Sequence, residues 1–514
     1  MSTLISAYLR RSRWRLLAWV LGVGLLPALM VVSTRVGYPT QADLDAFVRE
    51  SMASVAQVAI RGPIFEASVG GIVAWTLASS GSLVGCVIAM IFVVSYARAD
   101  EQAGRLELEL AGRATRREQL LAAVFVVGGA SVLTGLVAVV GLLATGMDPA
   151  GSVLLGLVLA SAMLFFTAVG AVCAQVAADS GAAGGLGAIA IGASVVLAAI
   201  GDATGSPLVW VSPFGWARHA QAFAGDRFWA PLIPLVLAVV LAWIALRLNA
   251  ARDYGTGAIP ARPGRATAPA WVRSPLTLAL RLQRGAVIGW TVALTLLGVL
   301  LGSVLAGLDQ QLAGSAFEDF AHWHGGTVGE VFFQFVLYLL AQIAAMAALV
   351  AVLALRRDEA GGLAEPVLAR AVTRRRWSVA GWTVAVMTSV AILLGVGVGA
   401  ALGSGRWSLP LTTVAYLPAT LVVVGLALAL TGWLPRAAVA VSWAALGLLI
   451  LLDLLAEFNL VSPQVVGRVS PFAATFSALF TGGLPVTLAV LTAIGLGLAA
   501  FGLVGIRRRD LRPS

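Results

Sequence analysis

The eighteen residues DEQAGRLELELAGRATRR, from Asp100 to Arg117, recur as DEAGGLAEPVLARAVTRR from Asp358 to Arg375. Nine of the eighteen positions match without a gap, at a constant offset of 258 residues. The matched pairs are Asp100/Asp358, Glu101/Glu359, Gly104/Gly362, Glu107/Glu365, Leu110/Leu368, Ala111/Ala369, Thr115/Thr373, Arg116/Arg374 and Arg117/Arg375. We call these copies the first and the second cassette. A charged segment that occurs twice at a fixed distance indicates an internal duplication.

Two further repeats extend the duplication beyond the cassettes. Val211–Phe214 recurs unchanged as Val469–Phe472, again at an offset of 258 residues, and both copies contain Ser-Pro-Phe. Near the start, Leu9–Trp19 pairs with Leu280–Trp290 at an offset of 271 residues. The first half therefore holds thirteen extra residues before its cassette, which we place in the segment 37–66.

Long apolar stretches separate these repeats. Mean hydropathy is +0.94 and charged residues make up 11% of the chain, against about 25% in a typical soluble protein. About twelve stretches are long enough, at roughly 20 residues, to cross a bilayer as helices. They lie near 16–35, 69–97, 119–147, 150–178, 183–201, 231–249, 285–307, 327–355, 379–403, 408–432, 437–456 and 483–506. The sequence predicts an all-α polytopic membrane protein with about 12 transmembrane helices.

The repeats divide the predicted spans into two groups of six. We predict a first transmembrane half at 1–250, a linker at 251–275 that is rich in Pro, Gly and Arg, and a second half at 276–514. Because six is even, both halves enter the membrane from the same side. The two six-helix repeats are therefore expected to be parallel, as in some transporters.

The distribution of charge predicts the orientation. All 34 basic residues are arginine. With both termini on one side, that side receives 27 arginines and 11 acidic residues, and the other side receives 7 and 13. Basic loops are retained in the cytoplasm. We therefore expect a multi-pass plasma-membrane protein with both termini cytoplasmic, and no nucleic-acid partner, because no folded domain carries a basic face.

The cassettes are predicted to dock on a soluble partner. Alternating charges spaced four apart, from Glu101 to Arg113, would form one face of a helix, although the run Leu106–Leu110 also fits a strand. The second cassette should form a helix only from about Pro366, after a turn at Gly361 and Gly362. Charged pairs on such a helix would fix the register of docking.

A simpler explanation competes for some arginines. Insertion topology alone places arginine at cytoplasmic span ends, and we expect this for Arg98, Arg356, Arg357 and the arginines of the C-terminal tail. Topology does not explain why Gly, Glu, Leu, Ala and Thr recur in the cassettes at fixed spacing.

The repeated motifs carry a family resemblance. Each six-span half has an E-x-x-G-x-x-E…T-R-R segment after its second span and an S-P-F segment before its sixth. In this the chain resembles an ATP-binding-cassette exporter permease, and more narrowly the actinobacterial antibiotic-export permeases of the tetronasin-resistance type. The resemblance implies that each cassette is a coupling helix seated in a groove of a separately encoded ATPase. The implied contact residues are Glu101, Gly104, Glu107, Arg116, Arg117, Glu359, Gly362, Glu365, Arg374 and Arg375.

The chain is not expected to be an enzyme. A phosphate-binding loop requires a lysine, and this sequence contains none. ATP and Mg²⁺ should therefore bind to the partner ATP-binding subunit, in two copies per permease. By resemblance alone, the transported compounds are hydrophobic drugs or antibiotic-like molecules. The alternative is a proton-coupled efflux transporter of the major-facilitator type, but the cassettes are longer than the tight turn of that family, and the S-P-F repeat has no place in it.

Aromatic residues within the predicted spans form a weak candidate substrate path. Aromatic faces suit flat apolar or cationic ligands, but they equally suit packing. The candidates are Phe165, Phe166, Phe332, Phe333, Phe335 and Tyr338. The glycines of Gly184–Gly187 suit close helix packing.

We predict no metal site. His322 and His324 fall in one loop, where solvated side chains are the expected state, and we expect the same for His219. Asp202 and Asp453, like Glu330, are acids expected close to outer span ends, within reach of water.

Overall fold

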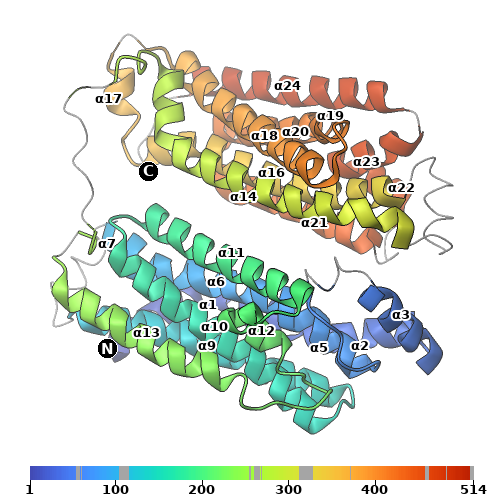
Figure 1. The fold of residues 1–514 in the computed structure, drawn as a ribbon. Helices are drawn as coiled ribbons and strands as arrows, with labels where there is room; N and C mark the ends of the chain where they lie inside the picture. Colours follow the sequence, from blue (N-terminus) through green and yellow to red (C-terminus); the bar gives the residue numbers. More distant parts are fainter. Residues whose placement is uncertain are drawn as a thin grey trace. The chain divides into compact units, whose positions relative to one another are not determined.

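The computed structural model describes residues 1–514 apart from 54–57, 59–60, 103–114, 254–255, 260–266, 268, 312–327, 371, 458–461, 482 and 510–514. The chain divides into two compact units, Met1–Gly264 and Arg265–Ser514. Within the described ranges every regular element is a helix (Figure 1). This confirms the predicted all-α class.

Unit 1 consists of long helices interrupted by short ones. In chain order these are α1 (Ser2–Gly24), α2 (Leu26–Gly37), α3 (Gln41–Ala53), α5 (Val69–Thr76), the π-helix η1 (Leu77–Gly81), α6 (Ser82–Val94), the π-helix η2 (Ser95–Ala99), α7 (Asp100–Gln102), α9 (Arg116–Ala144), α10 (Pro149–Val176), α11 (Ser180–Thr204), the 3₁₀ helix η3 (Pro207–Val211), α12 (Pro213–Arg218) and α13 (Leu232–Ala251).

Unit 2 has a similar series. Its helices are α14 (Pro275–Gln311), α16 (Val328–Ala360), α17 (Glu365–Leu368), α18 (Arg374–Ser404), α19 (Leu409–Val414), α20 (Leu417–Trp433), α21 (Ala438–Glu457), α22 (Pro463–Val469), α23 (Pro471–Thr481) and α24 (Leu484–Arg508).

Eleven stretches of described helix are long and apolar enough to cross a membrane. They coincide with eleven of the twelve predicted spans, because a chain in lipid must satisfy its backbone hydrogen bonds internally, as a helix does. The remaining span, predicted at 437–456, coincides with α21, whose apolar stretch Ala438–Asp453 is shorter than the others. The structure thus confirms a polytopic membrane protein.

One or two helices form the centre of each unit. In unit 1, α10 packs against α6, α9, α11 and α13. Of the residues in the most apolar stretch of α10, 72% are buried, against 17% for α13. In unit 2, α16 and α18 are the most buried spans, whereas α14 is mostly exposed. The exposed apolar helices are those available to lipid.

Glycine permits two close helix contacts in unit 2. A Cβ added at Gly302 of α14 would lie 2.2 Å from the Ala400 carbonyl oxygen of α18, and one added at Gly432 of α20 would lie 2.3 Å from the Gly502 carbonyl oxygen of α24. Both distances are too short for any side chain. Small residues let membrane helices approach in this way.

The close contacts expected for Gly184–Gly187 are only partly present. A Cβ at Gly184 or Gly185 would meet nothing within 4 Å, while one at Gly187 would meet the Met90 sulfur at 2.6 Å. Glycine content by itself does not identify the face that packs.

The extra segment of the first half contains helix α3. Figure 1 shows α3 at the end of unit 1 opposite the N-terminus. The Gln41 amide donates to the Ala67 carbonyl at 2.7 Å, and Phe47 contacts the rings of Tyr38 and Trp75. These contacts attach α3 to the start of the second span.

Candidate functional site: a buried glutamate and arginine cluster in each unit

A buried carboxylate stands where the first cassette begins. Glu101 in α7 is only 5% exposed, although it belongs to the charged cassette, which the sequence places in a loop between two spans. Both oxygens accept from Arg252, Nη1 to Oε1 at 2.9 Å and Nη2 to Oε2 at 2.7 Å. Arg98 also donates to Oε2, at 3.0 Å. We call Arg98, Glu101 and Arg252 the first cluster.

The first cluster connects the ends of several spans. Arg98 Nη2 donates to the Ala178 carbonyl at 2.6 Å, in the turn after the fourth span. Arg252 Nε donates to Gln175 Oε1 at 2.8 Å, and Arg116 Nη1 donates to the Arg252 carbonyl at 3.1 Å. Because a buried guanidinium needs partners for its N–H groups, these bonds hold the ends of the second, third, fourth and sixth spans together.

Unit 2 repeats the arrangement around Glu359, which is 4% exposed. Both its oxygens accept from Arg509, with Nη2 to Oε2 at 2.7 Å, and Arg356 lies 3.6 Å from Oε2. Arg356 Nε donates to the Pro435 carbonyl at 2.9 Å, and Arg374 Nη1 donates to the Arg509 carbonyl at 2.8 Å. We call Arg356, Glu359 and Arg509 the second cluster.

Each contact of the second cluster has its counterpart in the first. Residues 98, 101 and 116 correspond to 356, 359 and 374 at an offset of 258 residues, and residues 178 and 252 correspond to 435 and 509 at 257. Both units thus keep a buried glutamate paired with arginines, because an uncompensated charge there would be costly.

The T-R-R end of each cassette has a structural role. The Thr115 hydroxyl accepts from the backbone N–H of Glu118 and caps α9, and Thr373 caps α18 by accepting from Arg376. Such caps satisfy backbone donors that a helix start leaves free. The arginine that follows each threonine then reaches its cluster.

The structure separates the predicted contact residues into two groups. Glu101 and Glu359 are buried in the clusters, and Arg116 and Arg374 are half-buried beside them. The others that are described are exposed or half-buried at the cassette: Arg117, Gly362, Glu365 and Arg375. Gly104 and Glu107 lie outside the described residues.

The local form of the second cassette is confirmed. Helix α17 starts at Glu365 with Pro366 in its first turn. Before it, Gly361 N–H donates to the Arg357 carbonyl at 2.9 Å, and Gly362 has a φ of +70°. Such a φ favours glycine. The helix expected in the first cassette from Arg105 onward lies outside the described part of the chain.

The explanation by topology alone is wrong for three arginines. Arg98, Arg356 and Arg509 all belong to the clusters, although the sequence pattern assigned them only to span ends. The missed signal is an Arg-Asp pair after each sixth span, Arg252-Asp253 and Arg509-Asp510. Contact between groups 150 residues apart has no local signature.

The first unit has an additional ion pair, and the second unit has no arginine at the corresponding position. Both Nη atoms of Arg11 donate to Asp100, at 3.1 and 2.6 Å. The residue that corresponds to Arg11 at the offset of 271 is Leu282. The same ion pair therefore cannot form from that position in unit 2.

The S-P-F repeat attaches the short helix before each unit's sixth span to the fifth span. The Ser212 hydroxyl donates to the Ser194 carbonyl of α11 at 2.5 Å, and the Ser470 hydroxyl donates to Asp453 Oδ2 of α21 at 3.1 Å. Each serine also caps the helix after it. The phenylalanine of each copy, Phe214 or Phe472, is fully buried.

Asp202 and His219 differ from expectation. Asp202 is buried, with Oδ2 accepting from Arg218 at 2.7 Å and Oδ1 lying 2.9 Å from His219 Nε2. The His219 ring contacts those of Phe65 and Trp210. His219 is therefore part of a packed polar group, not a solvated side chain. Burial lowers the pKa of Arg218, and the Asp202 carboxylate opposes that effect.

Asp453 also differs from expectation, because it is buried rather than within reach of water. Glu330 is exposed, as predicted. His322 and His324 lie outside the described residues.

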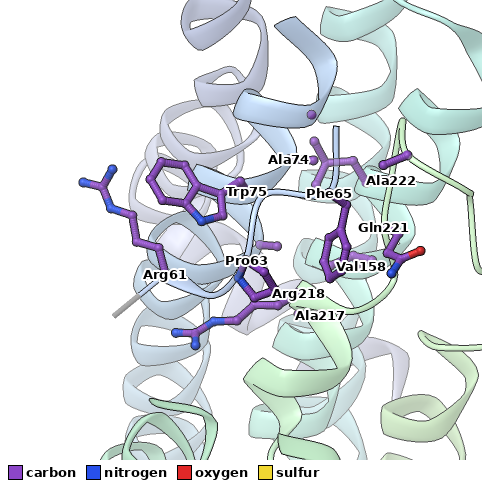
Figure 2. A pocket seen from close by; sticks show the side chains of 14 residues that line it. Arg61, Pro63, Phe65, Ala74, Trp75, Val158, Ala217, Arg218, Gln221 and Ala222 are labelled. Atoms are coloured by element: carbon purple, nitrogen blue, oxygen red, sulfur yellow. The ribbon is translucent and has the colours of Figure 1, made fainter. Parts of the chain in front are cut away.

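A pocket in unit 1 is too small for a drug. Arg61, Phe65, Trp75, Arg218 and Gln221 contribute to its wall (Figure 2). Its cavity volume is about 20 Å³, room for about one water molecule, whereas ligand pockets hold roughly 300–1,000 Å³. In this conformation the pocket is not a substrate site.

Several candidate path residues pack in the cores. Phe166 is fully buried and stacks on Phe214, with ring centroids 5.6 Å apart, and Phe333 is buried in unit 2. Phe165 and Phe335 are half-buried. Tyr338 contacts the ring of Phe476 at 5.6 Å. The side chain of Phe332 lies outside the described part. Whether any of these residues meets substrate stays a prediction.

Comparison with known proteins gives the family. Residues 272–507 match the family model described as the multidrug efflux system permease Rv1217c, C-terminal domain. The chain is also 35% identical to the multidrug efflux system permease protein Rv1217c of Mycobacterium tuberculosis (strain ATCC 25618 / H37Rv), over 99% of its own length and 95% of that protein's. The chain belongs to this family of multidrug efflux permeases, and it is the membrane subunit of a transporter rather than an enzyme.

Proposed function

We propose that this chain is the permease subunit of an ATP-binding-cassette exporter that moves hydrophobic drugs or antibiotic-like compounds out of the cell. ATP and Mg²⁺ bind to a separately encoded ATP-binding subunit, two copies of which dock on one permease. The cassette ends of both units, together with the termini, face the cytoplasm. The narrower resemblance to tetronasin-type antibiotic exporters is part of the same proposal.

The observation that carries the proposal is that both units place a buried cassette glutamate between two arginines, one at the end of the second span and one after the sixth. A cassette can transmit a movement of the ATP-binding subunit to the spans only if its attachment to those spans is rigid. In each unit the glutamate at the start of the cassette is bonded to an arginine beyond the sixth span and lies beside an arginine at the end of the second. Bidentate pairing adds geometric specificity.

The predicted contact residues differ in burial, and we assign the buried and the exposed ones different roles. Glu101 and Glu359 point into their own units, so they position the cassette. Of the predicted contact residues that are described, Arg117, Glu365 and Arg375 are the exposed charged side chains, and we propose that they reach the ATP-binding subunit. Surface charges of this kind steer association and fix register.

The proposed function is tested by purifying the tagged chain from native membranes in mild detergent. We expect an ATP-binding subunit to co-purify at two copies per permease, and the reconstituted complex to export with ATP alone. A chain that purifies by itself and transports under a proton gradient without ATP would support the major-facilitator alternative instead.

Reversing the exposed arginines should uncouple the complex. In an Arg117→Glu, Arg375→Glu variant, we expect drug-stimulated ATP hydrolysis and export to fall about tenfold or more, because charge reversal at a docking surface costs several kcal/mol. Membrane insertion should be unchanged, since both side chains are exposed. The measurement is ATPase activity and export in proteoliposomes.

Arg357→Glu provides a matched control, because it reverses an exposed arginine that precedes the cassette. It should leave coupling within twofold of the parent chain. Equal export by both variants would remove Arg117 and Arg375 from the docking surface.

A further inference from the structure

A second buried carboxylate lies within the membrane-spanning part of unit 2, away from the clusters. Asp453 of α21 is 5% exposed. Its Oδ2 accepts from Gln342 Nε2 at 2.7 Å and from the Ser470 hydroxyl at 3.1 Å, and the Tyr338 hydroxyl is close to the same carboxylate. The described groups that hydrogen-bond to this carboxylate are thus neutral donors.

Asp453 is the last residue of the apolar stretch Ala438–Asp453 of α21. Its partner Gln342 lies inside the apolar span Phe333–Ala360 of α16, nine residues after its first residue. A buried acidic side chain in a membrane-spanning segment is costly and is usually retained for function.

No cation neutralises this carboxylate within the described part of the chain. Asp453 forms no ion pair with a described residue, and Oδ1 accepts no well-formed hydrogen bond from one. The contrast is Asp202 in unit 1, which lies against Arg218. At the offset of 258 residues, the counterpart of Arg218 is Phe476, and Asp453 corresponds to Val195 rather than to Asp202.

Two further aromatic rings extend from Tyr338, whose hydroxyl is close to the Asp453 carboxylate. Phe476 contacts Tyr338 at 5.6 Å and Phe480 at 5.2 Å between ring centroids. Negative charge and aromatic faces together attract organic cations, because the ring quadrupole adds to the Coulomb attraction of the carboxylate. The carboxylate and the neighbouring rings together favour a cation from outside the chain.

We propose that Asp453 recognises the positive centre of lipophilic cationic substrates, with Tyr338 and Phe476 against their apolar groups. This inference rests on the proposed function and names a substrate class for it. The substrate's positive charge would lie beside the Asp453 carboxylate.

The test compares two compounds of similar shape and different charge. Inside-out vesicles containing the permease and its ATP-binding subunit are given methyltriphenylphosphonium, a cation, or triphenylphosphine oxide, which is neutral. For Asp453→Asn we expect ATP-dependent uptake of the cation to fall about tenfold or more, as loss of a bond to a charged group implies. Uptake of the neutral compound should stay within twofold.

Two variants make the result specific. Asp453→Glu keeps the charge and should keep uptake of the cation, whereas Glu330→Gln removes an exposed acid from the same α16 and should change neither uptake. Each variant is first checked for its amount in the membrane and for bound ATP-binding subunit. Equal loss of both compounds in Asp453→Asn would show a structural role and overturn the inference, as would no loss of either.

The failure of this inference is distinct from failure of the proposed function. A parent complex that takes up the neutral compound but not the cation overturns only the cation site. If ATP drives no uptake at all, the proposed function fails, and equilibrium binding of radiolabelled methyltriphenylphosphonium to the purified chain still tests Asp453. Equal binding by the parent and Asp453→Asn chains would then overturn the site.

Discussion

Replacing Glu101 by alanine is expected to lower the free energy of unfolding of the purified chain by about 3–5 kcal/mol. The change leaves Arg98 and Arg252 buried with no carboxylate between them, and an uncompensated buried charge is what makes such a loss large. Glu359→Ala should have a similar effect, because it strands Arg509 beside Arg356. Thermal unfolding in detergent, followed by tryptophan fluorescence, measures both.

The matched control is Glu365→Ala, which removes an exposed cassette glutamate and should change stability by no more than about 0.5 kcal/mol. A triple variant, Arg98→Met, Glu101→Leu, Arg252→Met, tests the cause. Because apolar residues of similar volume can replace a buried ion cluster, the triple variant should be more stable than Glu101→Ala. If Glu101→Ala unfolds at the same temperature as Glu365→Ala, the first cluster does not stabilise the packing of the helix ends within unit 1.

The second large effect is expected where α20 and α24 touch. Gly502→Ala should destabilise unit 2 by about 1–3 kcal/mol, and Gly502→Leu by more, because there is no room for the added atoms. A Cβ at residue 502 would lie 2.5 Å from the Leu428 carbonyl carbon, and Gly432 faces the same contact from the other helix. The backbones would have to separate, which removes packing along both spans.

Gly497 offers a control on the same helix. A Cβ there would meet nothing within 4 Å, so Gly497→Ala should be neutral or stabilise the helix by up to about 1 kcal/mol. Gly502→Ala is thus expected to lower the unfolding temperature, whereas Gly497→Ala should leave it unchanged or raise it. Equal shifts would show that helix propensity, not helix contact, decides the result.

The sequence by itself determined the elements and their duplication. Apolar length predicted eleven helices at their observed positions, because lipid leaves the backbone no partner but itself. The twelfth, α21, was also placed correctly, although its apolar stretch is shorter. Pro366 and Gly362 predicted the turn and short helix of the second cassette, since both residues act on the local backbone alone.

The tertiary structure decided which side chains meet. Glu101 and Arg252 are 151 residues apart, and no periodicity in either helix indicates their pairing. The cassette glutamates were therefore assigned to a partner surface, while the structure buries Glu101 and Glu359 and leaves Arg117 and Arg375 exposed.

The sequence also did not predict which side chains are buried or which glycines contact another helix. Glycines at 184 and 185 resemble those at 432 and 502, but only the latter pair faces another backbone. Asp453 was placed near water by its distance from the span end, whereas the segment with Ser470 folds against it. Local composition sets which residues form helices in lipid. The fit between helices far apart in the chain decides which charges are buried, which glycines are required and where a substrate can bind.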